Sequence, residues 1–523
     1  MATSHPQRGA IAAALALLLL LFVAATVASA LAAREGLPKR DDITANALAR
    51  AKEALLAYAS ARPVDEIVGP GYLPCPDLDD DGWAESICGS LNGETGQAQR
   101  LGRLPWKTLG LPDLRDAHGE RLWYAVSSKH KGLLNCAASS GCVDMGPEAA
   151  IGTITVRDAA GNVLHDGTSS SPYAPGIGGA VAVVLSPGAP LRRWGGNDQR
   201  RTCESGTCNT LGQCMTQPAS LTPKCHPENY LDRSPGPAFF DEDNARFIDR
   251  NDAAGRDLNR DGFIQGPVVD HQGVTWVNDR VLAISYDDLM PRVMRRVAAE
   301  VTACLQGYGA LPPNTGRTPW ATPACRARSS EAGKRWSDAE GVLFGRIPDT
   351  PFRATEQSSG GRMSTLWPVA PSACRIADTS GSTSSRTRYT WWSAWKRHVF
   401  YAVAEPNAPK PTSPEACDSI SCLTLVPTSG ETAPTPGYRF AVLVAGHPLL
   451  FDSHRQARDS AADREIREWL EASNAELRFM NANPAASDCP ADGIGPAGPV
   501  GSRANQLTIE RSRLVNDVVI ATP

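Results

Sequence analysis

The hydrophobic pattern of the chain opens with one long apolar run, which extends without a charge from Ala10 to Ala33, directly after Arg8 and Gly9. At ~1.5 Å of rise per residue, such a run forms a helix of roughly 36 Å, which is enough to cross a hydrocarbon core of about 30 Å. We therefore predict a transmembrane helix over this run, residues 10–33, behind a leader or cytoplasmic segment over residues 1–9. The rest of the chain would then lie outside the cytoplasm.

The same run also fits a cleaved secretory signal, because Ala28, Ser29 and Ala30 offer a small-residue cleavage site. The run is longer than the ~7–15 residues of a usual signal core, and a single Arg precedes it, so we favour a retained anchor. With the anchor retained, the protein is a single-pass inner-membrane protein with its bulk in the periplasm or on the cell surface. With the signal cleaved, it is secreted.

Two later segments place apolar residues at the spacing of an amphipathic helix. The first lies between Asp42 and Arg62, and the second lies between Asp287 and Tyr308, where two early aspartates favour a helix N-terminus. The apolar positions are Ile43, Ala47, Ala51, Leu55 and Tyr58 in the first segment, and Leu289, Val293, Val297, Val301 and Leu305 in the second. Each segment therefore predicts a helix that packs one face on a neighbouring layer.

Short blocks of similar sequence follow both amphipathic segments in the same order, and several of them are apolar runs of strand length. The matching blocks are Leu73-Pro74 with Leu311-Pro312-Pro313, Gly102–Pro105 with Gly345–Pro348, Leu122–Ser127 with Val399–Ala404, Ala180–Val184 with Phe440–Val444, and Asn278-Asp279 with Asn516-Asp517. This recurrence predicts a tandem duplication, with extracytoplasmic units over residues 41–285 and 286–523. Each unit would be a helix on a mostly antiparallel sheet, so the predicted fold class is α+β, loop-rich and stapled by disulfides.

Charge and composition exclude one class of partner. The chain has 52 basic and 56 acidic residues, a net charge of -4, and no basic face or tail of the kind that binds nucleic acid. We therefore predict no nucleic-acid partner. The 46 Gly and 41 Pro residues predict long irregular loops between short strands.

The chain has 14 cysteines, an even number that predicts disulfides in an exported protein. One cluster consists of Cys203, Cys208, Cys214 and Cys225, followed by His226. It lacks the paired C-x-x-C spacing of zinc sites, so we interpret its cysteines as disulfide partners too. The local pairs that we predict are Cys75 with Cys88, Cys136 with Cys142, Cys304 with Cys325, and Cys417 with Cys422.

Two acidic segments are candidate calcium loops, because they place oxygen ligands at alternate positions before a turn glycine. The clearer one has Asp257, Asn259 and Asp261 before Gly262, but Val268 occupies its twelfth position, where a calcium loop of this kind has a bidentate Glu. The weaker copy has Asp77, Asp79 and Asp81 before Gly82. Calcium is therefore the one cofactor that the sequence suggests, with a solvated turn as the alternative.

The sequence contains no catalytic motif of the common kinds. There is no G-x-S-x-G, H-E-x-x-H, P-loop or dinucleotide-binding glycine pattern, and the 9 histidines are scattered. We therefore expect a protein that is not an enzyme. Trp391, Trp392 and Trp395 are a candidate carbohydrate platform, although such clusters more often belong to a core or to a surface that meets a partner.

The leader and three later blocks resemble known families. Arg8-Gly9 before an apolar run resembles the leader of type IV pilins and of type II secretion pseudopilins, and the blocks LPCPD, GRLPW and LWYAVS resemble a group of pilin-like membrane proteins. The resemblance implies cleavage between Gly9 and Ala10 and assembly with other pilin or pseudopilin subunits. These families usually have a glutamate at the position of Ala14. One group of minor pilins also lacks this glutamate.

The predicted function is accordingly that of a membrane-anchored, minor-pilin-like component of a pilus or type II secretion pseudopilus, with a structural or assembly role. The alternative is a secreted periplasmic or cell-surface protein that binds a ligand after its signal peptide is removed.

Overall fold

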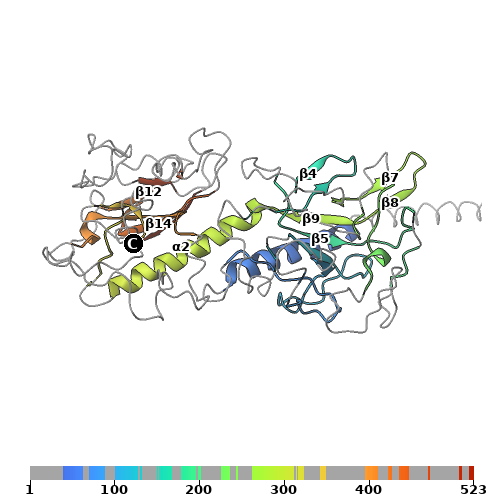
Figure 1. Ribbon diagram of the computed structural model, residues 1–523, viewed down its shortest axis with the longest axis horizontal. Helices are drawn as coiled ribbons and strands as arrows, with labels where there is room; N and C mark the ends of the chain where they lie inside the picture. Colours follow the sequence, from blue (N-terminus) through green and yellow to red (C-terminus); the bar gives the residue numbers. More distant parts are fainter. Residues whose placement is uncertain are drawn as a thin grey trace, which may run out of the picture.

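A computed structural model describes two similar groups of strands and two long helices (Figure 1). The residues that it describes are 39–62, 70–86, 88, 100–127, 130–131, 150, 152–167, 178–195, 198–201, 225–235, 243–245, 262–310, 314, 316–322, 342–348, 395–409, 422–426, 435–446, 469–470, 506–508 and 517–523. The predicted membrane helix over residues 10–33, the processing site at Gly9 and Ala10, and Ala14 lie outside them. Within the described ranges, neither helix has the length and apolar character that a membrane span requires.

The two larger sheets have the same topology. One has the strand order β1-β2-β5-β9 and the other β10-β11-β14-β16, and every pairing in both is antiparallel. The first sheet consists of β1 (Leu101–Arg103), β2 (Trp123–Val126), β5 (Ala182–Ser186) and β9 (Arg280–Ile284). The second consists of β10 (Phe344–Arg346), β11 (Val399–Val403), β14 (Phe440–Val444) and β16 (Val518–Thr522).

Two smaller sheets repeat a second pattern. They have the orders β4-β3-β6 and β13-β12-β15, and in each the central strand makes one antiparallel and one parallel pairing. Their strands are β3 (Val156–Arg157), β4 (Val163–His165), β6 (Phe263–Ile264), β12 (Leu423–Val426), β13 (Thr435–Tyr438) and β15 (Gln506–Thr508). A hairpin of β7 (Val268–Val269) and β8 (Thr275–Val277) follows β6, and two short 3₁₀ helices are η4 (Pro227–Asn229) and η6 (Glu405–Asn407).

Each larger sheet comes after a long helix in the chain. Residues 39–61 are helical, and only Ser285 separates the end of β9 from the start of α2 (Tyr286–Ala310). Ser285 caps α2, because its hydroxyl accepts the Asp288 amide at 3.2 Å while the Asp288 carboxylate accepts the Ser285 amide at 2.8 Å. Figure 1 shows α2 extending from the sheet that contains β9 to the sheet that contains β14, and it packs on β14 and β16.

The apolar pattern predicted the buried face of α2 better than that of the first helix. All five apolar positions predicted in α2 are fully buried. In the first helix, Ala47, Ala51 and Leu55 are buried, but Ile43 is 45% exposed and Tyr58 is only half-buried. The buried stripe instead includes Leu48, Leu56 and Ala59. Both helices and both larger sheets contribute to one continuous hydrophobic core.

The structure corrects one of the predicted sequence matches. The hydroxyl of Tyr124 donates to the carbonyl of Pro74 at 3.1 Å, and the hydroxyl of Tyr401 donates to the carbonyl of Pro319 at 3.0 Å. Because these tyrosines occupy equivalent positions on β2 and β11, the residue of the second half that corresponds to Pro74 is Pro319. The segment 311–313, which had been matched to it, lies outside the described residues. The coarse prediction of a mixed helix-and-sheet fold is confirmed.

Candidate functional site

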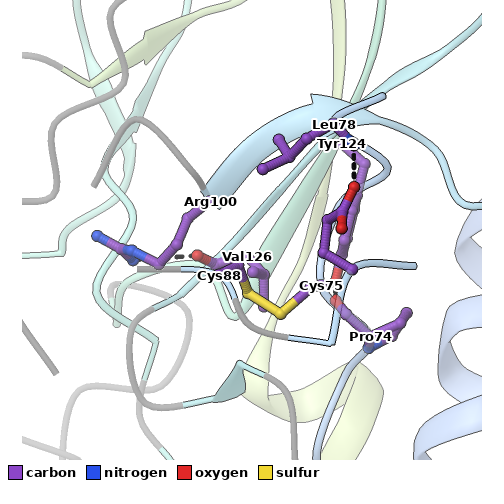
Figure 2. The surroundings of a disulfide bond; sticks show 8 residues. Pro74, Cys75, Leu78, Cys88, Arg100, Tyr124 and Val126 are labelled. Carbon is purple, nitrogen blue, oxygen red and sulfur yellow. Dashed lines mark hydrogen bonds between the residues drawn. A yellow bond between two sulfur atoms is a disulfide. The ribbon is translucent and has the colours of Figure 1, made fainter. Parts of the chain in front are cut away.

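An acidic loop closed by a disulfide holds the one cluster of three possible metal-ligating side chains among the described residues. Cys75 and Cys88 are bonded, with 5.6 Å between their Cα atoms, so this predicted pair is confirmed (Figure 2). Both cysteines are buried against the first sheet, close to the β2 residues Tyr124 and Val126. The disulfide therefore holds both ends of the loop against a rigid layer.

Other cysteines extend this picture. Cys225, Cys304 and Cys422 are also disulfide-bonded, as predicted for a disulfide-rich chain. For Cys225 this state supports the disulfide interpretation over the zinc interpretation, because a disulfide sulfur is no longer a thiolate ligand. The remaining members of the predicted pairs, Cys136, Cys142, Cys325 and Cys417, lie outside the described residues, as do Cys203, Cys208 and Cys214.

Three carboxylates meet inside the loop. Ligand oxygens of Asp77, Asp79 and Glu85 all lie within 4.8 Å of one another, with Asp77 buried, Glu85 half-buried and Asp79 exposed. The backbone bends around them at Asp80 and Gly82, which have φ angles of 63° and 89°. A turn of this shape favours glycine at residue 82, as the sequence pattern of the loop suggested.

The structure changes the membership of the predicted calcium loop. Asp81 was expected to be a ligand, but its carboxylate accepts the Trp83 amide at 2.7 Å. Glu85, which the sequence reasoning missed, joins Asp77 and Asp79 in its place. Glu85 is the ninth residue of the loop counted from Asp77, and the ninth position of a calcium loop is one of the ligand positions. That spacing was a usable signal.

Burial and like charge dominate the electrostatics of the loop. Burial, opposed by the Gly82 amide and reinforced by the neighbouring aspartates, raises the pKa of Asp77 to about 7. Burial also raises the pKa of Glu85. Three clustered carboxylates can hold a hard cation such as calcium through oxygen, or can take up a proton that relieves their repulsion.

Hydrogen bonds within the loop already satisfy part of this charge. The Gly82 amide donates to Asp77 Oδ2 at 2.7 Å, and the Asp81 amide donates to Asp77 Oδ1 at 3.2 Å. The Leu78 amide donates to Glu85 Oε1 at 3.2 Å. The loop therefore has internal partners for its buried oxygens, and its turn geometry by itself does not require a metal.

The other candidate residues lie outside the described residues, apart from Trp395. Those outside are Asp257, Asn259 and Asp261, the clearer predicted calcium ligands, and Trp391 and Trp392. Trp395 is only 1% exposed, so it belongs to the core and cannot serve as part of a carbohydrate platform.

An arginine sandwiched between aromatic rings occupies the same place in both larger sheets. The Arg103 guanidinium carbon lies 4.4 Å from the Trp123 ring centre and 4.1 Å from that of Tyr230. In the second sheet, Arg346 lies 3.8 Å from the Phe400 ring centre and 4.7 Å from that of Trp469. Both arginines are buried, so a ligand could not reach them. We therefore interpret these stacked side chains as contacts that stabilise the fold.

Comparisons with family models, with curated proteins and with solved structures found no match for the chain. The fold and the side-chain chemistry therefore carry the functional inference.

Proposed function

We propose that the protein is a membrane-anchored, extracytoplasmic, pilin-like component of a pilus or type II secretion pseudopilus, with a structural or assembly role. The observation that carries the proposal is the repeated plan in which a long helix is followed in the chain by a four-stranded antiparallel sheet. A long helix followed by an antiparallel sheet is the outline of the pilin architecture that the leader and the sequence blocks resemble.

The disulfides support the exported setting of this proposal. Cys75–Cys88 is formed, and three further described cysteines are bonded. Disulfides persist in oxidising compartments such as the periplasm and the cell surface, and they are rare in the cytosol. An uncharged run over residues 10–33 that is long enough to span a bilayer supplies the anchor in the same proposal.

Ala14 suggests which role the protein has among such subunits. In the families that the leader resembles, the glutamate at this position pairs with the amino terminus of the next subunit. Alanine has no carboxylate and cannot form that pair. We therefore place the protein at an initiating or accessory position, such as a tip or minor component, and not in the bulk of a polymer.

The amino-terminal residue of the mature protein tests the proposal. Co-expression with an active prepilin peptidase should give a mature chain that begins at Ala10, and Gly9→Val should leave the leader in place. Ser4→Ala, in the same leader but away from the cleavage site, is the matched control and should be processed normally. A mature chain that begins at Leu31 would support the secreted alternative, and one that begins at Met1 or Ala2 would leave a plain anchor without pilin processing.

A further inference from the structure

Two buried aspartates, Asp232 and Asp279, face each other where β9 begins. Asp232 and Asp279 are both fully buried. The Asp232 amide donates to Asp279 Oδ2 at 2.8 Å, and the Asp279 amide donates to Asp232 Oδ2 at 3.2 Å. The pair therefore joins the segment 225–235 to the strand that closes the first sheet.

Three of the four carboxylate oxygens of this pair accept hydrogen bonds from N–H groups. Besides the two reciprocal bonds, Asn278 N donates to Asp232 Oδ2 at 2.7 Å and Gln199 Nε2 donates to Asp232 Oδ1 at 2.8 Å. Asn244 Nδ2 donates to Asp279 Oδ2 at 2.9 Å. The fourth oxygen, Oδ1 of Asp279, is buried and has no hydrogen-bond partner among the described residues.

The charged groups that the structure describes around the pair have other partners. The charge of Arg201 acts on both aspartates, but its guanidinium donates to the carbonyls of Tyr230, Pro187 and Gly188. On the segment 243–245, Asp243 is paired with Arg193, which also faces Glu228. On β9 itself, Arg280 points to Asp41, 3.1 Å away in an exposed pair. Of these described cations, Arg201 is the one whose charge acts on both aspartates, and a single positive charge does not balance two buried carboxylates.

We propose that Asp279 carries a proton on Oδ1, and that this carboxylic acid makes the junction between segment 225–235 and β9 a pH-sensitive latch. A proton fits the site better than a metal ion, because N–H hydrogens surround the other oxygens and would repel a cation. Burial, together with the charge of Asp232, raises the pKa of Asp279, and burial raises the pKa of Asp232.

The sign of the pH effect follows from this proton. Above the ordinary aspartate pKa of about 4, the folded protein keeps a proton that the unfolded chain releases, so the stability of the folded state falls as pH rises. The folding equilibrium constant should fall ~10-fold per pH unit for the one proton held, until the folded-state pKa is passed. The junction between segment 225–235 and β9 is therefore more stable in mild acid than in alkaline solution.

Asp279→Asn tests the latch, because an amide keeps the acceptor for Asp232 and Asn244 and replaces the acid O–H with an N–H. In the full-length protein in detergent, the melting temperature of the wild type should fall between about pH 5 and about pH 9. The variant should show a shallower fall and a higher melting temperature at the alkaline end.

Asp517→Asn is the matched control, since Asp517 precedes β16 as Asp279 precedes β9 and is buried as well. It should keep the pH slope of the wild type.

Should Asp279→Asn fail to fold, the infrared band of a buried protonated carboxyl can be followed in the wild type. The band should be present near neutral pH and disappear in alkali together with hydrogen-exchange protection of segment 225–235. Equal pH slopes in the wild type and Asp279→Asn, or no such band at neutral pH, would overturn the proposal.

Discussion

Single residues show how closely the two larger sheets correspond. Gly102 and Gly345 are central residues of β1 and β10, and each faces a tyrosine of the neighbouring strand. A Cβ atom at Gly102 would lie 2.7 Å from the Asp77 carbonyl oxygen, and one at Gly345 would lie 2.1 Å from the Thr322 carbonyl oxygen. Both strands therefore need glycine because another backbone segment passes directly over them.

Gly345→Ala should consequently destabilise the protein strongly. The new methyl group meets a backbone carbonyl, which cannot rotate away as the end of a side chain can, so we expect a loss of about 2–3 kcal/mol or more in the free energy of unfolding. Gly119→Ala is a useful control, because its φ of 80° imposes strain while no atom lies within 4 Å of the new Cβ. Denaturant titration should rank Gly345→Ala as clearly the more destabilised, and a loss no larger than that of Gly119→Ala would show that the segments do not pass this closely.

At the scale of elements, the sequence predicted what depends on periodicity and missed what depends on tertiary contact. The five-residue stripe of α2 and the strands β5 and β14 follow directly from apolar spacing. The membership of Glu85 in the carboxylate cluster depends on how loops cross the sheet, and so does the correspondence of Pro74 with Pro319. The local sequence does not encode these crossings. The same is true of Tyr230 and Trp469, which reach their arginines from segments far along the chain.

Two described ion pairs join the two helices, Lys52 with Asp288 and Arg292 with Glu53, and the strength of the less exposed Lys52–Asp288 pair should depend on pH. Lys52 Nζ lies 2.8 Å from Asp288 Oδ2 and 3.1 Å from the Ala283 carbonyl oxygen, so it ties the first helix to both α2 and β9. Burial by itself raises the pKa of Asp288, but Lys52 and the amide and hydroxyl of Ser285 outweigh it, and the net pKa is lowered. An ion pair that lowers a carboxyl pKa stabilises the folded state above about pH 4. This stabilisation is lost as the pH falls further.

Lys52→Met should therefore cost up to about 1 kcal/mol at neutral pH, since the pair is partly exposed. The difference from the wild type should shrink as the pH falls below about 4 and Asp288 becomes protonated in both proteins. Glu300→Gln, which removes the Arg296–Glu300 pair within α2, is the control and should cost no more than about 0.5 kcal/mol. Urea titrations of the three proteins at neutral and acid pH measure these differences, and a cost for Lys52→Met that does not change with pH would contradict the role of the ion pair.

At the scale of the whole molecule, α2 is the element that joins the repeated halves. It follows β9 with a single intervening residue, and it contributes its buried face to a core that also contains β11, β14 and the first helix. A helix of 25 residues is ~38 Å long, so it can reach from one sheet to the other as one continuous element. A shared core and a continuous helix should make the folding of one half depend on the other.

This dependence predicts cooperative unfolding of the two sheets. A change confined to the second sheet, Gly345→Ala, should lower the melting temperature of the first sheet by the same amount, because neither can lose its packing on α2 without exposing the common core. Calorimetry should show one transition, and hydrogen exchange should report equal losses of protection in β2 and β11. Gly102→Ala provides the reciprocal case in the first sheet and should also lower both. The contrary outcome is two calorimetric transitions, with each variant lowering only the transition of the sheet that it changes. That result would mean that the halves are independent domains and that α2 links them without coupling them.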